Sequence, residues 1–285
     1  MTLRIAGPLI LAAACSAWSA RGADAQSIGY LVPDRFELSP GSEISVQLAR
    51  GKAGVLASAP WPSREVDWFL VRAAGGQRNV ENPSPARDGE TSVRIALADP
   101  DVTLIGIDRR PWIESVPGAE LREFLGRDLE PSALPAGWQA HAAADTIRVR
   151  HVESAKLLVR VAGRKDDLHG SATAFSKTGQ RTEIRPMIDP TSMAVGGDLP
   201  LRVSWAGGAD AETRIVARQV AAGVVQTATT SKEAGRFLVT APGRWQVEVH
   251  RARWLAGDPA ADWELETATL CFVVPEPGKP EGGGK

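Results

Sequence analysis

The chain has 285 residues, with 33 Lys and Arg against 34 Asp and Glu, so its formal net charge is −1. This balance excludes the basic surface that nucleic-acid binding requires and an acidic, solvating composition. Apolar residues make up 43% and charged residues 24%, as in folded globular proteins, and the length predicts about two domains of ~100–150 residues.

Residues 1–25 have the features of a secretory signal peptide. Arg4 supplies a positive charge, residues 5–14 form an apolar run, and Ala-Asp-Ala at 23–25 offers a cleavage site before Gln26. The run is too short to span a bilayer, which takes ~20 apolar residues. We therefore expect a periplasmic or secreted protein with no transmembrane segment after cleavage. An uncleaved N-terminal anchor is an open alternative.

The two cysteines have different expected fates. Cys15 would be the acylated residue if the chain were a lipoprotein, which is a second alternative to signal cleavage. After cleavage, Cys271 remains without a partner for a disulfide. Because no group close in sequence would lower its pKa, we expect Cys271 to be a buried strand residue rather than a nucleophile.

Alternation of apolar and polar residues dominates the rest of the chain. It is clearest over residues 43–48, 92–97, 146–152, 156–163, 199–205 and 245–250. Each pattern predicts a strand with an apolar face inward and a polar face outward, and Gly/Pro turns separate the strands. The predicted fold is all-β, with two tandem immunoglobulin-like β-sandwich modules.

One segment, residues 117–129, has helical spacing instead. Leu121, Phe124, Leu125 and Leu129 recur on one face, and charged residues take the other. We expect one short helix here, packed on the end of the first sandwich.

The domain boundary is expected near residues 185–190, where two prolines favour a short, extended connector. This predicts an N-terminal β-sandwich region over 26–187, a C-terminal β-sandwich over 188–275 and a disordered tail over 276–285. The polar loop from Arg164 to Gln180 is a candidate to cover a groove between the two regions.

Several segments of the second region resemble prealbumin-like or carboxypeptidase-regulatory-like modules. They are a closing hairpin with Gly-Arg and Pro-Gly-x-Trp elements, a first strand and a last strand, at residues 231–247, 188–203 and 261–272. The resemblance implies a prealbumin-like sandwich for this part of the chain.

Three further segments extend the resemblance, at residues 36–41, 121–125 and 154–161. In this order, the segments resemble a family of exported bacterial proteins with a domain of unknown function, over most of residues 26–275. That family is often labelled as a periplasmic component or accessory of nickel or cobalt uptake. Membership would imply transition-metal handling and a metal transporter component as a partner.

The sequence departs from the metal-linked relatives at its expected mature start. Those relatives present a His there, whereas residues 26–33 contain none and the first His is His141. Asp166, Asp167 and His169 are weak candidates for holding a divalent transition metal, since carboxylate and imidazole both suit such ions. The alternative interpretation of this cluster is a solvated loop tip.

No sequence motif for catalysis or for a bound cofactor is present. The carboxylates Glu65 and Asp67 share a strand face, a common arrangement in β proteins. His151 and His250 are expected to be solvated or hydrogen-bonded.

The tryptophans fall into two groups. Trp68, Trp205 and Trp245 share strand phases with Leu or Val and are expected in the core. Trp61, Trp138 and Trp254 lie beside turns or in weakly patterned segments, and are candidates for a ligand or partner surface.

Together these features predict a non-enzymatic, exported binding or accessory protein, with a link to nickel or cobalt uptake implied by the resemblance. The alternative is a structural or adhesion-type module that docks another envelope protein through a strand edge or an aromatic patch. An enzyme ranks third.

Overall fold

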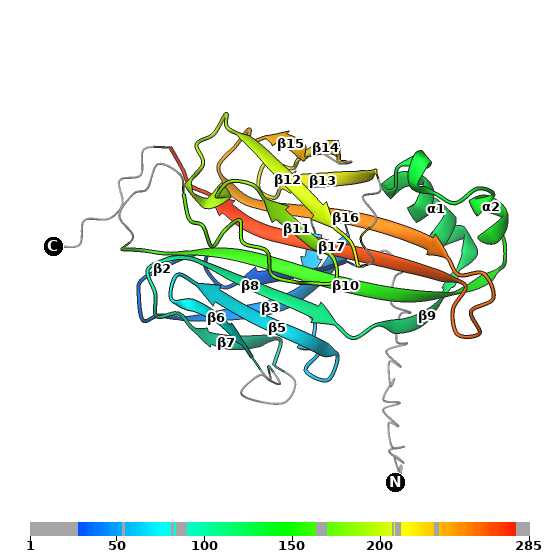
Figure 1. The fold of residues 1–285 in the computed structure, drawn as a ribbon, viewed down its shortest axis with the longest axis horizontal. Coiled ribbons are helices and arrows are strands. Elements are labelled where there is room, and N and C mark those ends of the chain that lie inside the picture. Colours follow the sequence, from blue (N-terminus) through cyan, green and yellow to red (C-terminus); the bar gives the residue numbers. More distant parts are fainter. Residues whose placement is uncertain are drawn as a thin grey trace, which may run out of the picture.

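The computed structural model describes residues 28–52, 55–80, 83, 90–163, 170–206, 208, 212–230 and 234–277 (Figure 1). The predicted signal peptide, the metal candidates Asp166, Asp167 and His169, and nearly all of the predicted tail lie outside these residues.

A ten-stranded sheet runs through the molecule and joins the two halves of the chain (Figure 1). Its path is β14 (Val224–Thr230), β13 (Thr213–Gln219), β16 (Gly243–Trp254), β17 (Trp263–Val274), β10 (Thr146–Val161), β8 (Asp101–Arg109), β5 (Val66–Ala73) and β6 (Gly76–Asn79), and β2 (Glu37–Leu38) and β9 (Trp112–Pro117) also pair with β10. The join is a parallel pairing of β10 with β17, from Val149–Trp263 to Leu157–Cys271.

Two smaller sheets cover opposite faces of this large sheet. One contains β1 (Ile28–Pro33), β3 (Glu43–Lys52), β4 (Val55–Ala57) and β7 (Ser92–Ala96), and the other contains β11 (Glu183–Pro186), β12 (Asp198–Ser204) and β15 (Gly235–Leu238). The all-β sandwich prediction is therefore confirmed. The segment expected as an extended connector begins with the last two residues of β11, Arg185 and Pro186, which pair with β12.

Three apolar clusters fill the layers. The first lies under β1 and β3 and includes Ile44 and Leu157, and the second lies under β12 and β15 and includes Phe237 and Trp245. Because side chains alternate along a strand, β10 sends Leu157 into the first cluster and Leu158 into the second. Its two sides are thus both covered.

The predicted helix is confirmed as α1 (Gly118–Asp128), with Leu121, Phe124 and Leu125 buried. These side chains form the third cluster with residues of β9, β10, β16 and β17. The helix therefore covers strands from both halves of the chain rather than the end of the first sandwich alone. A second helix, α2 (Trp138–His141), was not predicted. Two single 3₁₀ turns, η1 (Pro131–Ala133) and η2 (Pro190–Ser192), complete the helical segments of the residues that the structure describes.

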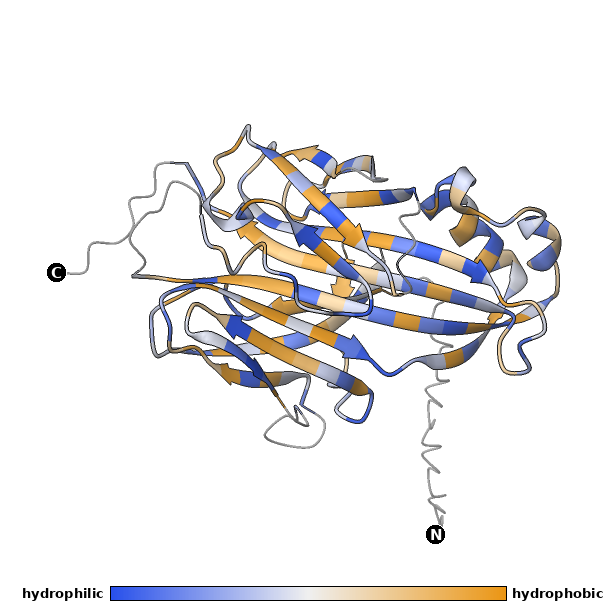
Figure 2. Cartoon of the chain, viewed as in Figure 1, coloured by the Kyte–Doolittle hydropathy of each residue, from blue (hydrophilic) through white to orange (hydrophobic). Residues whose placement is uncertain are grey.

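The prediction that the polar strand faces point to solvent is wrong for the central strands. Hydrophilic and hydrophobic residues do alternate along them (Figure 2). However, Gln246, Glu248 and His250 of β16 are buried, as are Glu153 and Lys156 of β10. The covering layers of β1, α1 and β11 bury faces that an open sandwich would expose.

Candidate functional site

The central sheet opens between β10 and its neighbours β8 and β9. β10 pairs with β8 from Leu158 to Val161 and with β9 from Thr146 to His151. The registers of the two stretches differ by one residue, and no ladder pairing joins residues 152–157 to residues 105–111. Backbone polar groups in this opening need other partners, because burying them unpaired is costly.

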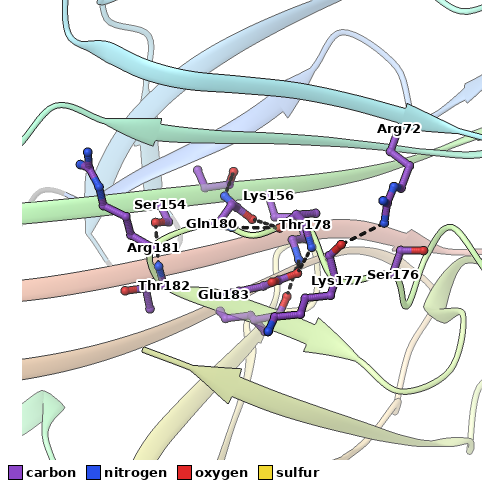
Figure 3. Close-up of polar contacts among 12 residues, drawn as sticks. Arg72, Ser154, Lys156, Ser176, Lys177, Thr178, Gln180, Arg181, Thr182 and Glu183 are labelled. Atoms are coloured by element: carbon purple, nitrogen blue, oxygen red, sulfur yellow. Dashed lines mark hydrogen bonds and ion pairs between the residues drawn. The ribbon is translucent and has the colours of Figure 1, made fainter. Parts of the chain in front are cut away.

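Residues 176–183 lie along one face of β10, and Gln180 and Arg181 reach the opening (Figure 3). We call the described residues 170–182 the strap. Gln180 Nε2 donates to Ile107 O at 2.9 Å and to Ala155 O at 3.0 Å, so one amide serves a carbonyl on each side of the opening. The described part of the predicted covering loop therefore plugs the sheet rather than roofing an open groove.

Asp108 holds the next residues of the strap. Its carboxylate accepts from Ser154 Oγ at 2.6 Å and from the Arg181 backbone N–H at 3.0 Å. Burial raises the pKa of Asp108, and these two hydrogen bonds oppose that rise. Thr182 N–H donates to Ser154 Oγ and extends the network (Figure 3).

Lys156 and Glu183 form a buried ion pair beside the strap. The distance from Lys156 Nζ to Glu183 Oε1 is 2.6 Å, and both side chains are 1% exposed. Burial lowers the pKa of Lys156. Burial alone would raise the pKa of Glu183, but Lys156 and the Thr178 N–H outweigh it, and that pKa is lowered. The pair links the large sheet to β11.

A second polar cluster lies on the opposite face of β10. The Glu153 carboxylate accepts from Gly29 N–H at 2.7 Å, from Arg109 Nη1 at 2.7 Å and from Arg50 Nη2 at 3.1 Å. Arg109 also pairs with Glu65. Strands β1, β3, β8 and β10 are thereby tied together at one carboxylate.

Trp112 and His151 lie beside this cluster. The Arg109 guanidinium lies 4.1 Å from the Trp112 ring centroid, and the His151 ring stacks on Trp112 at 4.9 Å. Burial lowers the pKa of His151 to about 4. His151 Nε2 is buried without a hydrogen-bond partner among the described residues. The imidazole is therefore neutral near pH 7.

These clusters have structural rather than catalytic geometry. The carboxylates Glu65 and Asp67, which share a strand face in the sequence, pair with Arg109 and Arg181 respectively. Cys271 is buried as predicted, and burial raises the pKa of its thiol to about 12. Neither a free carboxylate pair nor a thiolate is available at these positions.

Within the described ranges, no group of three or more His, Cys, Asp or Glu residues could hold a metal ion. None of the described helices has the length and apolar character needed to cross a bilayer.

The tryptophan side chains differ in how far they are exposed to solvent. Trp254 is 41% exposed, which confirms it as a surface residue. The prediction for Trp61 is wrong: it is buried, its indole N–H donates to Pro83 O at 2.7 Å, and its ring packs on Phe69. Trp138 is half-buried against the third cluster. Trp205 and Trp245 are buried as expected, and Trp68 is partly buried.

Trp254 is held in a fixed position at the end of the β16–β17 hairpin. Its ring stacks on His141 of α2 with centroids 3.5 Å apart and planes 13° apart. The hairpin tip is tied to β10 by ion pairs, Arg148–Asp262 and Arg150–Asp258, each at 2.7 Å. We call Trp254 and His141 the aromatic platform. This pairing could not be predicted from local sequence patterns, because His141 and Trp254 are far apart in the chain.

Comparison with known proteins adds little to this description. No protein-family model and no curated protein matches the chain. Among solved structures, the chain is similar to the fibronectin(III)-like modules of Clostridium thermocellum CbhA, with 10% identity, 90% of this chain and 99% of that chain covered, and a TM-score of 0.21. A TM-score this low supports no functional conclusion.

Proposed function

We propose that this chain is a non-enzymatic, exported binding or accessory protein that docks another envelope protein through the aromatic platform. One observation carries the proposal: Trp254 remains 41% exposed although its ring is fixed by His141. Tryptophan is enriched among the residues that dominate binding energy at interfaces. A ring that is already ordered loses little entropy when a partner covers it.

The buried clusters support a module that presents a surface rather than one that performs chemistry. Lys156 is paired with Glu183, Glu153 with two arginines, and His151 is neutral and stacked. These groups stabilise the layers. Because a fold does not by itself specify a function, the proposal rests on the surface residues rather than on the layered sheets.

Crosslinking at the platform tests the proposal. A photoreactive residue at the exposed position Gln139 of α2 should give one discrete adduct with an envelope protein in cells that produce the full chain. Trp254→Ala in the same protein should reduce that adduct at least tenfold, because it removes the central contact. Leu238→Ala, which truncates a 52% exposed side chain on β15, is the matched control and should leave the adduct unchanged. An adduct insensitive to Trp254→Ala, or none at all, would contradict docking at this surface.

The transition-metal link and the exported location stay predictions. The metal link depends on the family resemblance and on Asp166, Asp167 and His169. The location depends on the signal-peptide pattern of residues 1–25.

A further inference from the structure

A cavity of about 310 Å³ lies at the edge of the first sandwich, between β6 and the end of β7. This volume is at the lower end of the range for small-ligand sites, ~300–1,000 Å³. Strands β6 and β7, which border the cavity, are separated along the long axis of the molecule from α2, which carries His141 of the aromatic platform (Figure 1). It is thus independent of the proposed docking surface.

Two chain segments, residues 75–78 and 96–99, face each other across this cavity in antiparallel directions. Gly75 N–H donates to Asp99 Oδ2 at one end, and Arg78 Nη2 donates to Ala96 O at the other, both at 3.1 Å. Side chains rather than backbone pairs make both links. The segments therefore stand too far apart to pair as strands, and the space between them is the cavity.

The walls leave the main chain accessible. Gly75, Gly76, Ala96 and Ala98 line the cavity and are exposed, and β6 ends the ten-stranded sheet with all four residues exposed. Gly76 has φ of +134°, a conformation that favours glycine. Ala73 of β5 and Thr103 of β8 also line the cavity, so it opens over the face of the sheet rather than along the free edge of β6.

The floor and ends of the cavity have distinct chemistry. Val71 and Leu97 are buried and give an apolar floor. Arg78 and Asp99 stand at opposite ends, and neither forms an ion pair with another described residue. They lie three positions apart along the facing segments, a span of ~10 Å at strand rise.

We propose that this cavity binds a short peptide of two or three small residues, extended between β6 and β7, with both termini free. A fully extended tripeptide spans ~10 Å, the same length as three positions along the facing segments. Its ammonium group lies at Asp99 and its carboxylate at Arg78, because an arginine fork suits a carboxylate. Its small side chains contact Val71 and Leu97.

Titration calorimetry of the full chain with three peptides tests both charge contacts. The probes are Ala-Ala-Ala, its N-acetyl form and its C-terminal amide. Blocking either terminus should weaken binding at least tenfold, about 1.4 kcal/mol. Asp99→Asn should weaken the binding of the free peptide as much as N-acetylation does, and should leave the affinity of the acetyl peptide unchanged. Arg78→Gln should weaken the binding of the free peptide as much as C-terminal amidation does, and should leave the affinity of the amide peptide unchanged.

Arg94→Gln is the matched control, because Arg94 is an exposed β7 residue outside the cavity lining. It should change no affinity, and thermal unfolding should show that all three variants are folded. The proposal is overturned if the free peptide gives no heat at millimolar concentration. It is also overturned if both blocked peptides bind as tightly as the free one, since the cavity would then accept an internal segment of a protein chain instead of a free peptide.

Discussion

Several polar side chains in this protein are buried by a second layer of structure. The alternation of apolar and polar residues along a strand does not predict which strand faces such a layer covers. Period-2 patterning correctly placed Trp245 and Cys271 inside. The same patterning placed His250 on a solvent face, whereas α1 covers it and Phe124 packs against its ring. Burial lowers the pKa of both His151 and His250. Local sequence reports which residues share a face, but what covers that face depends on contacts far along the chain.

The buried histidines make stability depend on pH. His151 has a pKa lowered from 6.5 to about 4, so the unfolded chain binds a proton more readily than the folded chain between these values. The free energy of unfolding should therefore fall as pH decreases through this window. At ~1.4 kcal/mol per pH unit, the loss from His151 totals about 3 kcal/mol.

His151→Phe keeps a ring on Trp112 and cannot be protonated. Urea unfolding at several values between pH 4 and 6.5 should give a shallower dependence for this variant than for the wild type; His250 and the carboxyls of Glu183, Asp258 and Asp262, whose pKa values are also lowered, contribute to the slope that remains. Equal slopes in the two proteins would mean that His151 is not buried as described.

At the scale of elements, the strands and α1 were predictable and the strap was not. The periodic spacing of apolar residues predicts the strands and the helix; in α1 these residues include Leu121, Phe124 and Leu125. The strap has no such period, because polar contacts hold it in place. Gln180 can bond a carbonyl on each strand because β8 and β10 diverge at this point. The divergence follows from the register of β10 with β8 and β9, which the residues of a single strand do not indicate.

Gln180→Leu should destabilise the protein by about 2–4 kcal/mol, since it leaves two buried carbonyls unpaired at ~1–3 kcal/mol each. Those carbonyls are Ile107 O and Ala155 O. Equilibrium urea unfolding measures the loss. Gln139→Leu on exposed α2 is the control, with an expected change below ~0.5 kcal/mol. Similar losses in the two variants would argue against the plug.

The whole molecule is two layered sandwiches that share one sheet. The predicted division at residue 187 stays a prediction, yet β10 from one side of it and β17 from the other pair along most of the length of β17. Composition and turns could suggest two regions, because those signals are local. They could not indicate the parallel pairing, which joins segments more than 100 residues apart.

We expect the shared sheet to make unfolding a single cooperative transition. Trp245→Ala removes a side chain that is 2% exposed, and should cost about 3–5 kcal/mol, as large truncations in a core do. Hydrogen exchange should then show loss of protection in β3 as well as in β16. Two separate transitions, or a cost below ~1 kcal/mol, would contradict this account.

The place of β17 also bears on how the chain reaches its native state. Among the described strands this one comes last in sequence, but it lies between β16 and β10. Until residues 263–274 have been synthesised, β10 lacks its parallel neighbour and the large sheet stays in two unjoined parts. Contacts between segments so distant in sequence slow folding. Nascent or truncated chains that lack residues 263–274 therefore expose the unpaired edges of β10 and β16. Pairing of β17 with both of these strands is the step that completes the large sheet.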